Sequence, residues 1–155
     1  MLQIHWSEPI SVRPMFGSDV VIVVRLEKQA PSPWGRSLII DELNRNHSFA
    51  LVAVVADEVV GWCCSRYVKE QAELLKISVA ESWRRRSVAK FMLAALEKQL
   101  RTVAVLTLYL EVRSENLPAL SFYRQVGFTV TGRRINYYSQ PRDDAVILRK
   151  PISQS

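Results

Sequence analysis

Hydrophobic and polar positions follow two periods along this chain, and each period predicts a different kind of element. Alternation and β-branched runs predict strands over residues 10–13, 49–56, 59–66, 73–79, 107–112, 128–131 and 144–148. Apolar positions at helical spacing predict helices over residues 18–29, 35–44, 87–100 and 116–126. Because two of the helices cross between strands late in the chain, this order predicts an α/β fold around a mixed sheet.

Short polar segments set the boundaries of several elements. The Gly-Ser-Asp stretch at 17–19 suits the N-cap of the first helix. Asp57 and Glu58 separate two β-rich runs, which predicts a hairpin turn without the usual glycine. Pro118 in the first turn and Gly127 after the last turn bound the fourth helix.

Length and composition fit one domain over residues 1–155. Hydrophobic residues make up 48% of the chain and charged residues 23%, as in ordinary globular proteins. The longest apolar run, 49–56, is much shorter than the roughly 18 residues of a membrane span. Residues 1–5 lack the basic start and apolar middle of a signal peptide. We therefore expect a cytoplasmic protein without membrane association.

The net charge of +6 fits a nucleic acid, an anionic cofactor or a partner on the ribosome. Cys63 and Cys64 are adjacent, so on a strand they point to opposite faces and are not expected to bond to each other. This cysteine pair and the two histidines have no metal-ligand spacing. We expect no metal site.

Residues 77–87 predict a strand that leads through a short loop into the N-terminus of a helix. Unpaired backbone N–H groups converge at such a point, and the helix dipole favours negative charge there. With three arginines at 84–86, the arrangement suits a pyrophosphate. An ordinary strand-to-helix turn with solvated arginines has the same spacing, so the pattern alone leaves both interpretations open.

The loop sequence Arg-Arg-Arg-Ser-Val-Ala at 84–89 resembles the coenzyme A pyrophosphate loop of the GNAT superfamily, Gln/Arg-x-x-Gly-x-Gly/Ala. Arg84 fills the first position of that motif and Ala89 the last. Ser87 stands where the family usually has glycine, which tolerates a positive φ and close approach to phosphate. Serine has a steric cost if its φ is positive, so we expect weaker or slightly shifted cofactor binding.

Several other stretches are similar to RimI-type ribosomal-protein-alanine N-acetyltransferases of that superfamily, and the resemblance covers residues 10–152. These stretches are 72–79, 110–113, Asn116, 122–123, 126–128, 134–138 and, more loosely, 33–34. The resemblance implies a GNAT-like single domain, with a mixed central sheet of about six to seven strands flanked by about four helices. It also implies acetyl-coenzyme A as co-substrate.

The resemblance assigns roles to individual residues. Glu111 is implied as the general base and Tyr123 as the general acid. The implied coenzyme-binding residues lie along the pantetheine arm, at the phosphates and on the fourth helix: Ile77, Ser78, Val79, Arg84, Arg85, Arg86, Ser87, Val88, Ala89, Lys90 and Asn116.

The chemistry of acetyl transfer explains these residue types. An α-amine with a pKa near 7.7 is roughly a third neutral at pH 7.5, whereas a lysine amine is about a thousandth neutral. An α-amine therefore needs only a weak general base, and a glutamate acting through water is sufficient. Tyr123 can donate a proton to the departing sulfur, and the backbone N–H of Val79 can polarise the thioester carbonyl.

The leading interpretation is transfer of acetyl to a protein N-terminus, by resemblance the N-terminal alanine of a ribosomal protein. We expect a monomer that makes no direct contact with nucleic acid. One alternative keeps the fold and acetylates a small amine, and another is a non-catalytic acyl-coenzyme A-binding module. Tyr137 and Tyr138 either line a peptide slot or pack within a strand, and Trp34 is expected to pack in the core or a loop.

Overall fold

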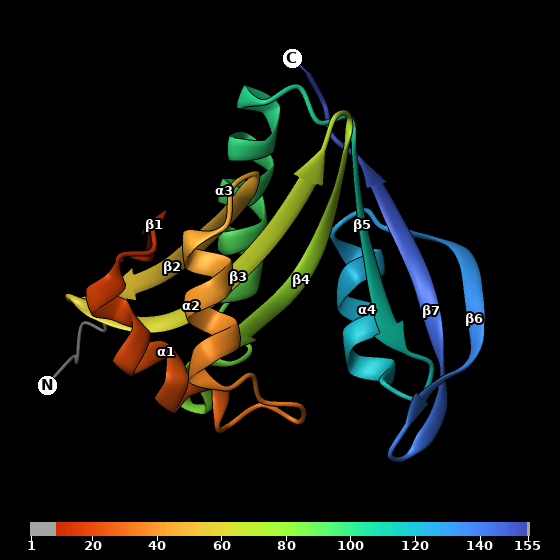
Figure 1. Cartoon of the computed structure of the whole chain (residues 1–155), viewed down its shortest axis with the longest axis horizontal. Helices are drawn as coiled ribbons and strands as arrows, with labels where there is room; N and C mark the ends of the chain where they lie inside the picture. Colours follow the sequence, from red (N-terminus) through yellow and green to blue (C-terminus); the bar gives the residue numbers. More distant parts are fainter. Residues whose placement is uncertain (1–8, 155) are drawn as a thin grey trace, which may run out of the picture. The chain divides into compact units, whose positions relative to one another are not determined.

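The computed structural model describes residues 9–154 and confirms the predicted order of elements. The residues 1–5 considered above lie outside this range. The elements are β1 (Ser11–Pro14), η1 (Gly17–Asp19), α1 (Val20–Glu27), α2 (Arg36–Asn44), β2 (Ser48–Val55), β3 (Glu58–Val68), β4 (Gln71–Val79), η2 (Glu81–Trp83), α3 (Val88–Thr102), β5 (Thr107–Arg113), α4 (Leu117–Gln125), β6 (Thr129–Ser139) and β7 (Arg142–Pro151). The seven strands form a mixed sheet in the order β1-β2-β3-β4-β5-β7-β6 (Figure 1).

The described chain divides into two compact units. The first unit contains the residues up to Cys64 together with Lys76–Leu96, and the second contains Ser65–Leu75 and the residues from Glu97 onward. Strands β3 and β4 and helix α3 contribute to both units. The single domain expected over 1–155 stays a prediction, and each unit is described by itself.

Two boundaries in the first unit differ from the prediction. A 3-10 turn, η1, occupies 17–19, and α1 begins only at Val20, because Asp19 accepts a hydrogen bond from the backbone N–H of Phe16 at 2.7 Å. The β2–β3 turn is centred on Ala56 and Asp57, with φ of 47° and 63°, and Glu58 already belongs to β3. Positive φ at both central residues matches the twist of paired strands, and here it is reached without glycine.

A buried glutamate on α1 connects that helix to two strands of the first unit. Glu27 has no exposed surface, and its Oε1 accepts hydrogen bonds from Trp62 Nε1 at 2.8 Å and Ser78 Oγ at 2.9 Å. Its Oε2 accepts the backbone N–H of Trp34 at 3.0 Å and lies 3.4 Å from Lys76 Nζ. Every oxygen of this buried charge is therefore compensated, as a buried carboxylate requires.

The neighbour of Trp62 on β3 shows that α1 and α3 lie on opposite faces of the sheet in the first unit. A Cβ added at Gly61 would lie 3.0 Å from Met92 Cε of α3 and 3.1 Å from the carbonyl oxygen of Ser78. Consecutive strand residues point to opposite faces, so Trp62 points to Glu27 of α1 while Gly61 faces α3. Glycine at this position allows α3 to approach the strand closely.

The cysteine pair next to these residues on β3 is buried. Neither Cys63 nor Cys64 forms a disulfide. Burial raises the pKa of the Cys63 thiol to about 12, so the reactive thiolate is not populated at neutral pH.

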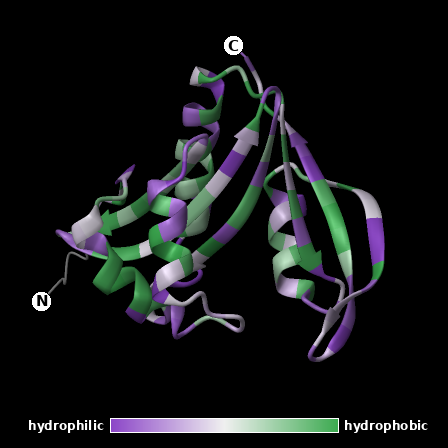
Figure 2. Cartoon of the chain, viewed as in Figure 1, coloured by the Kyte–Doolittle hydropathy of each residue, from purple (hydrophilic) through white to green (hydrophobic). Residues whose placement is uncertain are grey.

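Strand β5 is the two-faced strand of the second unit. Leu108, Leu110 and Val112 are buried on one face, and β7 packs beside them in antiparallel register, with Leu110 opposite Leu148. Figure 2 shows the hydrophobic middle of β7 beside the more hydrophilic β6. The alternate residues of β5 form a polar face: Tyr109, Glu111 and Arg113.

Helix α4 in the second unit is bounded as the sequence predicts. Asn116 is its N-cap, and the side-chain Oδ1 accepts the backbone N–H of Ala119 at 3.2 Å. Gly127 follows the helix with φ of 103°, a conformation that glycine adopts without strain. No helix in residues 9–154 is long and apolar enough to cross a membrane.

Removing the Glu27 carboxylate should destabilise the protein strongly. The substitution Glu27→Ala removes the counter-charge of Lys76 and the acceptor of the Trp62 N–H, which costs about 3–5 kcal/mol of unfolding free energy. Urea denaturation measures this loss. The control Asp41→Ala removes an exposed carboxylate from α2 and should change stability by less than about 0.5 kcal/mol. Equal effects of the two substitutions would contradict the structural role of Glu27.

Candidate functional site

The end of β4 in the first unit holds the three residues predicted to lie beside the pantetheine arm. Ser78 is buried, and its hydroxyl donates to Glu27. Ile77 and Val79 are half-buried and point to the face opposite Ser78. The Ser78 side chain is thus committed to the α1 contact, which leaves the backbone of this strand for the predicted cofactor contacts.

Arg84 holds the loop between β4 and α3 to the rest of the first unit. Its Nε donates to the carbonyl oxygen of Val79 at 3.2 Å, and its Nη2 donates to the carbonyl oxygen of Gln29 at 3.0 Å. These bonds connect the end of β4 with the segment after α1. Of the three predicted arginines, Arg84 therefore has an internal role that the motif did not indicate.

Ser87 adopts the left-handed conformation that its motif position calls for. Its φ is 65°, and Arg85 two residues earlier has φ of 61°. A non-glycine residue in this region carries a strain of roughly 1–3 kcal/mol. The substitution of serine for the usual glycine leaves the backbone path intact but stores strain in the loop.

The start of α3 presents backbone N–H donors next to this loop. Phe91 N–H donates to the Ser87 carbonyl oxygen at 3.1 Å, which begins the helical hydrogen-bond ladder. The N–H groups of Val88, Ala89 and Lys90 precede that bond and have no acceptor within the helix. Together with the dipole of a 15-residue helix, they form an anion-binding geometry.

Replacing Ser87 with glycine should relieve the loop. We expect Ser87→Gly to raise the unfolding free energy by about 1 kcal/mol. Glycine removes the strain that serine has in the left-handed conformation, and the greater entropy of the unfolded glycine chain offsets part of this gain. Ser87→Ala is the matched control, because it keeps the Cβ and its strain but lacks the hydroxyl. Thermal denaturation distinguishes them, and equal stability of the glycine and alanine variants would contradict strain at this position.

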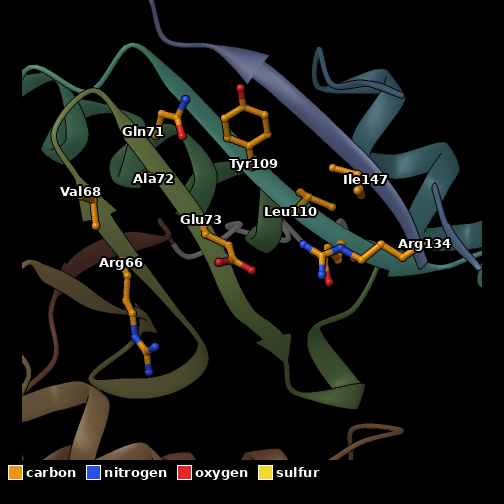
Figure 3. A pocket seen from close by; sticks show the side chains of 10 residues that line it. Arg66, Val68, Gln71, Ala72, Glu73, Tyr109, Leu110, Arg134 and Ile147 are labelled. Carbon is orange, nitrogen blue, oxygen red and sulfur yellow. The ribbon is translucent and has the colours of Figure 1, made fainter. Parts of the chain in front are cut away.

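Glu111, the predicted base, lines a cavity of about 430 Å³ within the second unit. Its Oε1 lies 3.0 Å from Nε of Arg134 on β6, and its side chain is 19% exposed. Figure 3 shows the side chains of Glu73 and Arg134 extending toward one another in this cavity. The lining residues come from β3, β4, β5, β6 and β7: Arg66, Val68, Gln71, Ala72, Glu73, Tyr109, Leu110, Glu111, Arg134 and Ile147.

Glu73 is a second carboxylate in this cavity that the sequence did not single out. Partial burial and the negative charge of Glu111 raise its pKa, and Arg66 and Arg134 oppose that shift less strongly. Alternation with the buried Ala72 and Leu74 could have placed Glu73 on the polar face of its strand. The pairing of β4 with β5, which brings it beside Glu111, has no local sequence signal.

Tyr138 packs within the β6–β7 hairpin. The Arg113 guanidinium lies 4.2 Å from its ring centroid and also donates to the carbonyl oxygens of Gln140 and Pro141. Burial and the Glu111 charge raise the pKa of Tyr138. Tyr137 is 51% exposed instead, so of the two alternatives the packing one describes Tyr138.

Tyr123 and Asn116, the other predicted site residues of the second unit, both belong to α4 or its cap. Tyr123 is 7% exposed, and its ring contacts Phe122 and Phe128 at centroid distances of 5.2 Å and 5.4 Å. The Asn116 side chain caps the helix. The roles of Tyr123 as an acid and Asn116 as a coenzyme contact stay predictions.

The model of the Acetyltransferase (GNAT) family matches residues 21–128. The chain belongs to the GNAT acetyltransferase family. A relative in Salmonella typhimurium LT2, the [ribosomal protein bS18]-alanine N-acetyltransferase, is 30% identical over 140 residues, which cover 88% of this chain and 93% of the relative. The seven-stranded mixed sheet with its four helices is the GNAT fold, as predicted.

Solved GNAT structures agree with this fold. The ribosomal-protein-S18-alanine N-acetyltransferase of Escherichia coli has a TM-score of 0.86 at 24% identity, covering 95% of this chain and 96% of that one. An aminoglycoside 6′-N-acetyltransferase complexed with coenzyme A has a TM-score of 0.81 at 18% identity, covering 92% of this chain and 97% of that one. The same fold thus accommodates coenzyme A in a structural neighbour.

Proposed function

We propose that this enzyme transfers acetyl from acetyl-coenzyme A to the α-amino group of a protein N-terminus, with the N-terminal alanine of a ribosomal protein as its preferred acceptor. The observation that carries the proposal is the similarity to bS18-alanine N-acetyltransferase over most of both chains. Such an acceptor is made in the cytoplasm, where we infer that the enzyme acts as a monomer.

The phosphate loop of the first unit fits the anionic part of the co-substrate. Three N–H groups at the start of α3 that lack an acceptor within the helix, and the exposed side chains of Arg85, Arg86 and Lys90, supply donors and positive charge. Arg84 contributes by holding the loop through Val79 and Gln29. When bound, acetyl-coenzyme A supplies the acetyl group as an activated thioester.

The proposed chemistry assigns one proton transfer to each of two side chains. Glu111 accepts one proton from the acceptor ammonium, directly or through water, and the neutral amine nitrogen then forms its bond to the acetyl carbon. The second nitrogen proton leaves to solvent as the amide forms. Tyr123 donates its phenolic proton to the sulfur as the carbon–sulfur bond breaks. The ion pair with Arg134 fixes the orientation of the Glu111 carboxylate, and the Val79 N–H is the proposed donor to the thioester oxygen.

The charges around the Glu111 cavity favour an acceptor with a single amine over a polycationic small molecule. Two carboxylates, Glu73 and Glu111, are accompanied by two guanidinium groups, those of Arg66 and Arg134. A polyamine or aminoglycoside carries several ammonium groups and would meet both arginines. An N-terminal peptide needs one ammonium site.

Substitution of the proposed acid and base should lower turnover without abolishing folding. We expect Glu111→Gln and Tyr123→Phe each to reduce kcat by about 10²–10⁴-fold on a peptide that begins with alanine. Release of free coenzyme A measures the rate, and thermal denaturation checks that the variants fold. Unchanged kcat in Tyr123→Phe would refute the role of the phenol.

A panel of acceptors tests the substrate class. Wild-type turnover on alanine-starting peptides supports acetylation of a protein N-terminus, and turnover only on free amines contradicts it. Binding of acetyl-coenzyme A without turnover on any acceptor would instead indicate a binding module.

A further inference from the structure

Strand register places a second carboxylate beside the proposed base. Residue Glu73 of β4 is paired with Tyr109 of β5 in parallel register, and Glu111 lies two residues further along β5 on the same face. The pairing of the two strands ends at Glu73 and Tyr109, so Glu111 lies just beyond the last paired position of β5. Both side chains line the same cavity, so an ammonium group between them can reach both carboxylates.

The cavity distributes its positive charge unequally between these carboxylates. Arg134 Nε lies 3.0 Å from Glu111 Oε1, and its guanidinium carbon lies 5.4 Å from the ring centroid of Tyr137. These two contacts hold the guanidinium group beside Glu111. The pKa of Glu73 is raised by lost hydration and by Glu111 in spite of Arg66 and Arg134. A cation that enters beside Glu73 would therefore relieve the repulsion between the two carboxylates.

The acceptor itself brings such a cation. An α-amine with a pKa near 7.7 is about two-thirds protonated at pH 7.5, so most of it arrives as an ammonium ion. It becomes nucleophilic only after losing one proton. A site that first binds the ammonium and then delivers it to a neighbouring base serves both needs.

We propose that Glu73 is the residue that binds the α-ammonium group of the acceptor, beside Glu111 on the same face of the sheet, before Glu111 takes its proton. The inference rests on the proposed N-terminal acetylation. Glu73 is a substrate-binding residue in this scheme and accepts no proton itself. It selects acceptors that carry a positive charge at the reacting nitrogen.

The substitution Glu73→Gln tests this role in steady-state kinetics with acetyl-coenzyme A and an alanine-starting peptide. We expect KM for the peptide to rise about five- to tenfold, while kcat changes less than about twofold. The rise in KM corresponds to the loss of one charge pair between enzyme and peptide in a partly open site. The matched control is Glu70→Gln, an exposed carboxylate in the turn before β4, which should leave both constants unchanged. A fall in kcat with constant KM would overturn the proposal.

A second measurement isolates the ammonium contact. Two peptides are compared by calorimetric binding in the presence of coenzyme A: the alanine-starting peptide and the same peptide with its α-amine replaced by a hydroxyl group. The wild-type enzyme should prefer the amine, and Glu73→Gln should remove most of that preference. Equal weakening of both peptides would show that Glu73 has a structural role only.

The two proposals fail in different ways. If wild type acetylates no N-terminal peptide, the proposed function fails, and the binding comparison still decides whether Glu73 recognises the ammonium. If wild type acetylates the peptide and Glu73→Gln keeps the same KM and the same amine preference, the inference about Glu73 fails alone. Absence of peptide binding by the wild type overturns both.

Discussion

The parallel pairing of β4 with β5 is the constraint on which the chemistry of the second unit depends. Three residue pairs, from Gln71 with Thr107 to Glu73 with Tyr109, fix the register. Because side chains alternate, a slip of one residue would turn Glu73 to the face where Leu108 and Leu110 are buried. An uncompensated carboxylate in that apolar layer is strongly unfavourable, so the hydrophobic face enforces the register that aligns the polar one.

Two glutamates of this chain show how surroundings decide what a carboxylate can do. Glu27 is fully buried, and its carboxylate accepts hydrogen bonds from Trp62, Ser78 and Trp34, with Lys76 as counter-charge. These contacts hold α1 against β3 and β4. Glu73 faces a cavity in which lost hydration and the charge of Glu111 raise its pKa in spite of two guanidinium groups. The first carboxylate is satisfied by the protein, and the second is left to interact with a ligand.

The sequence was sufficient to predict those features whose signal is local or carried by a motif. Pro118 in the first turn and Gly127 after the last turn predicted the bounds of α4, and the loop motif anticipated the positive φ of Ser87. The sequence was insufficient to predict contacts that depend on which strands are neighbours in the sheet. Neither the proximity of Glu73 to Glu111 nor the ion pair with Arg134 follows from residue spacing, because both are set by sheet register and by the irregular pairing of β6 with β7. The roles of Glu111 and Tyr123 still rest on resemblance.

Arg84 explains how the phosphate loop tolerates two left-handed residues. The strain at Arg85 and Ser87 must be offset within the fold, since the unfolded chain does not bear it. The bonds of Arg84 to Val79 and Gln29 fix the start of the loop, and the α3 ladder that begins with the Ser87 carbonyl fixes its end. With both ends held, the backbone between them has little freedom to relax into a right-handed turn. The N–H groups at the start of α3 are therefore oriented before any anion arrives, which lowers the entropic cost of binding one.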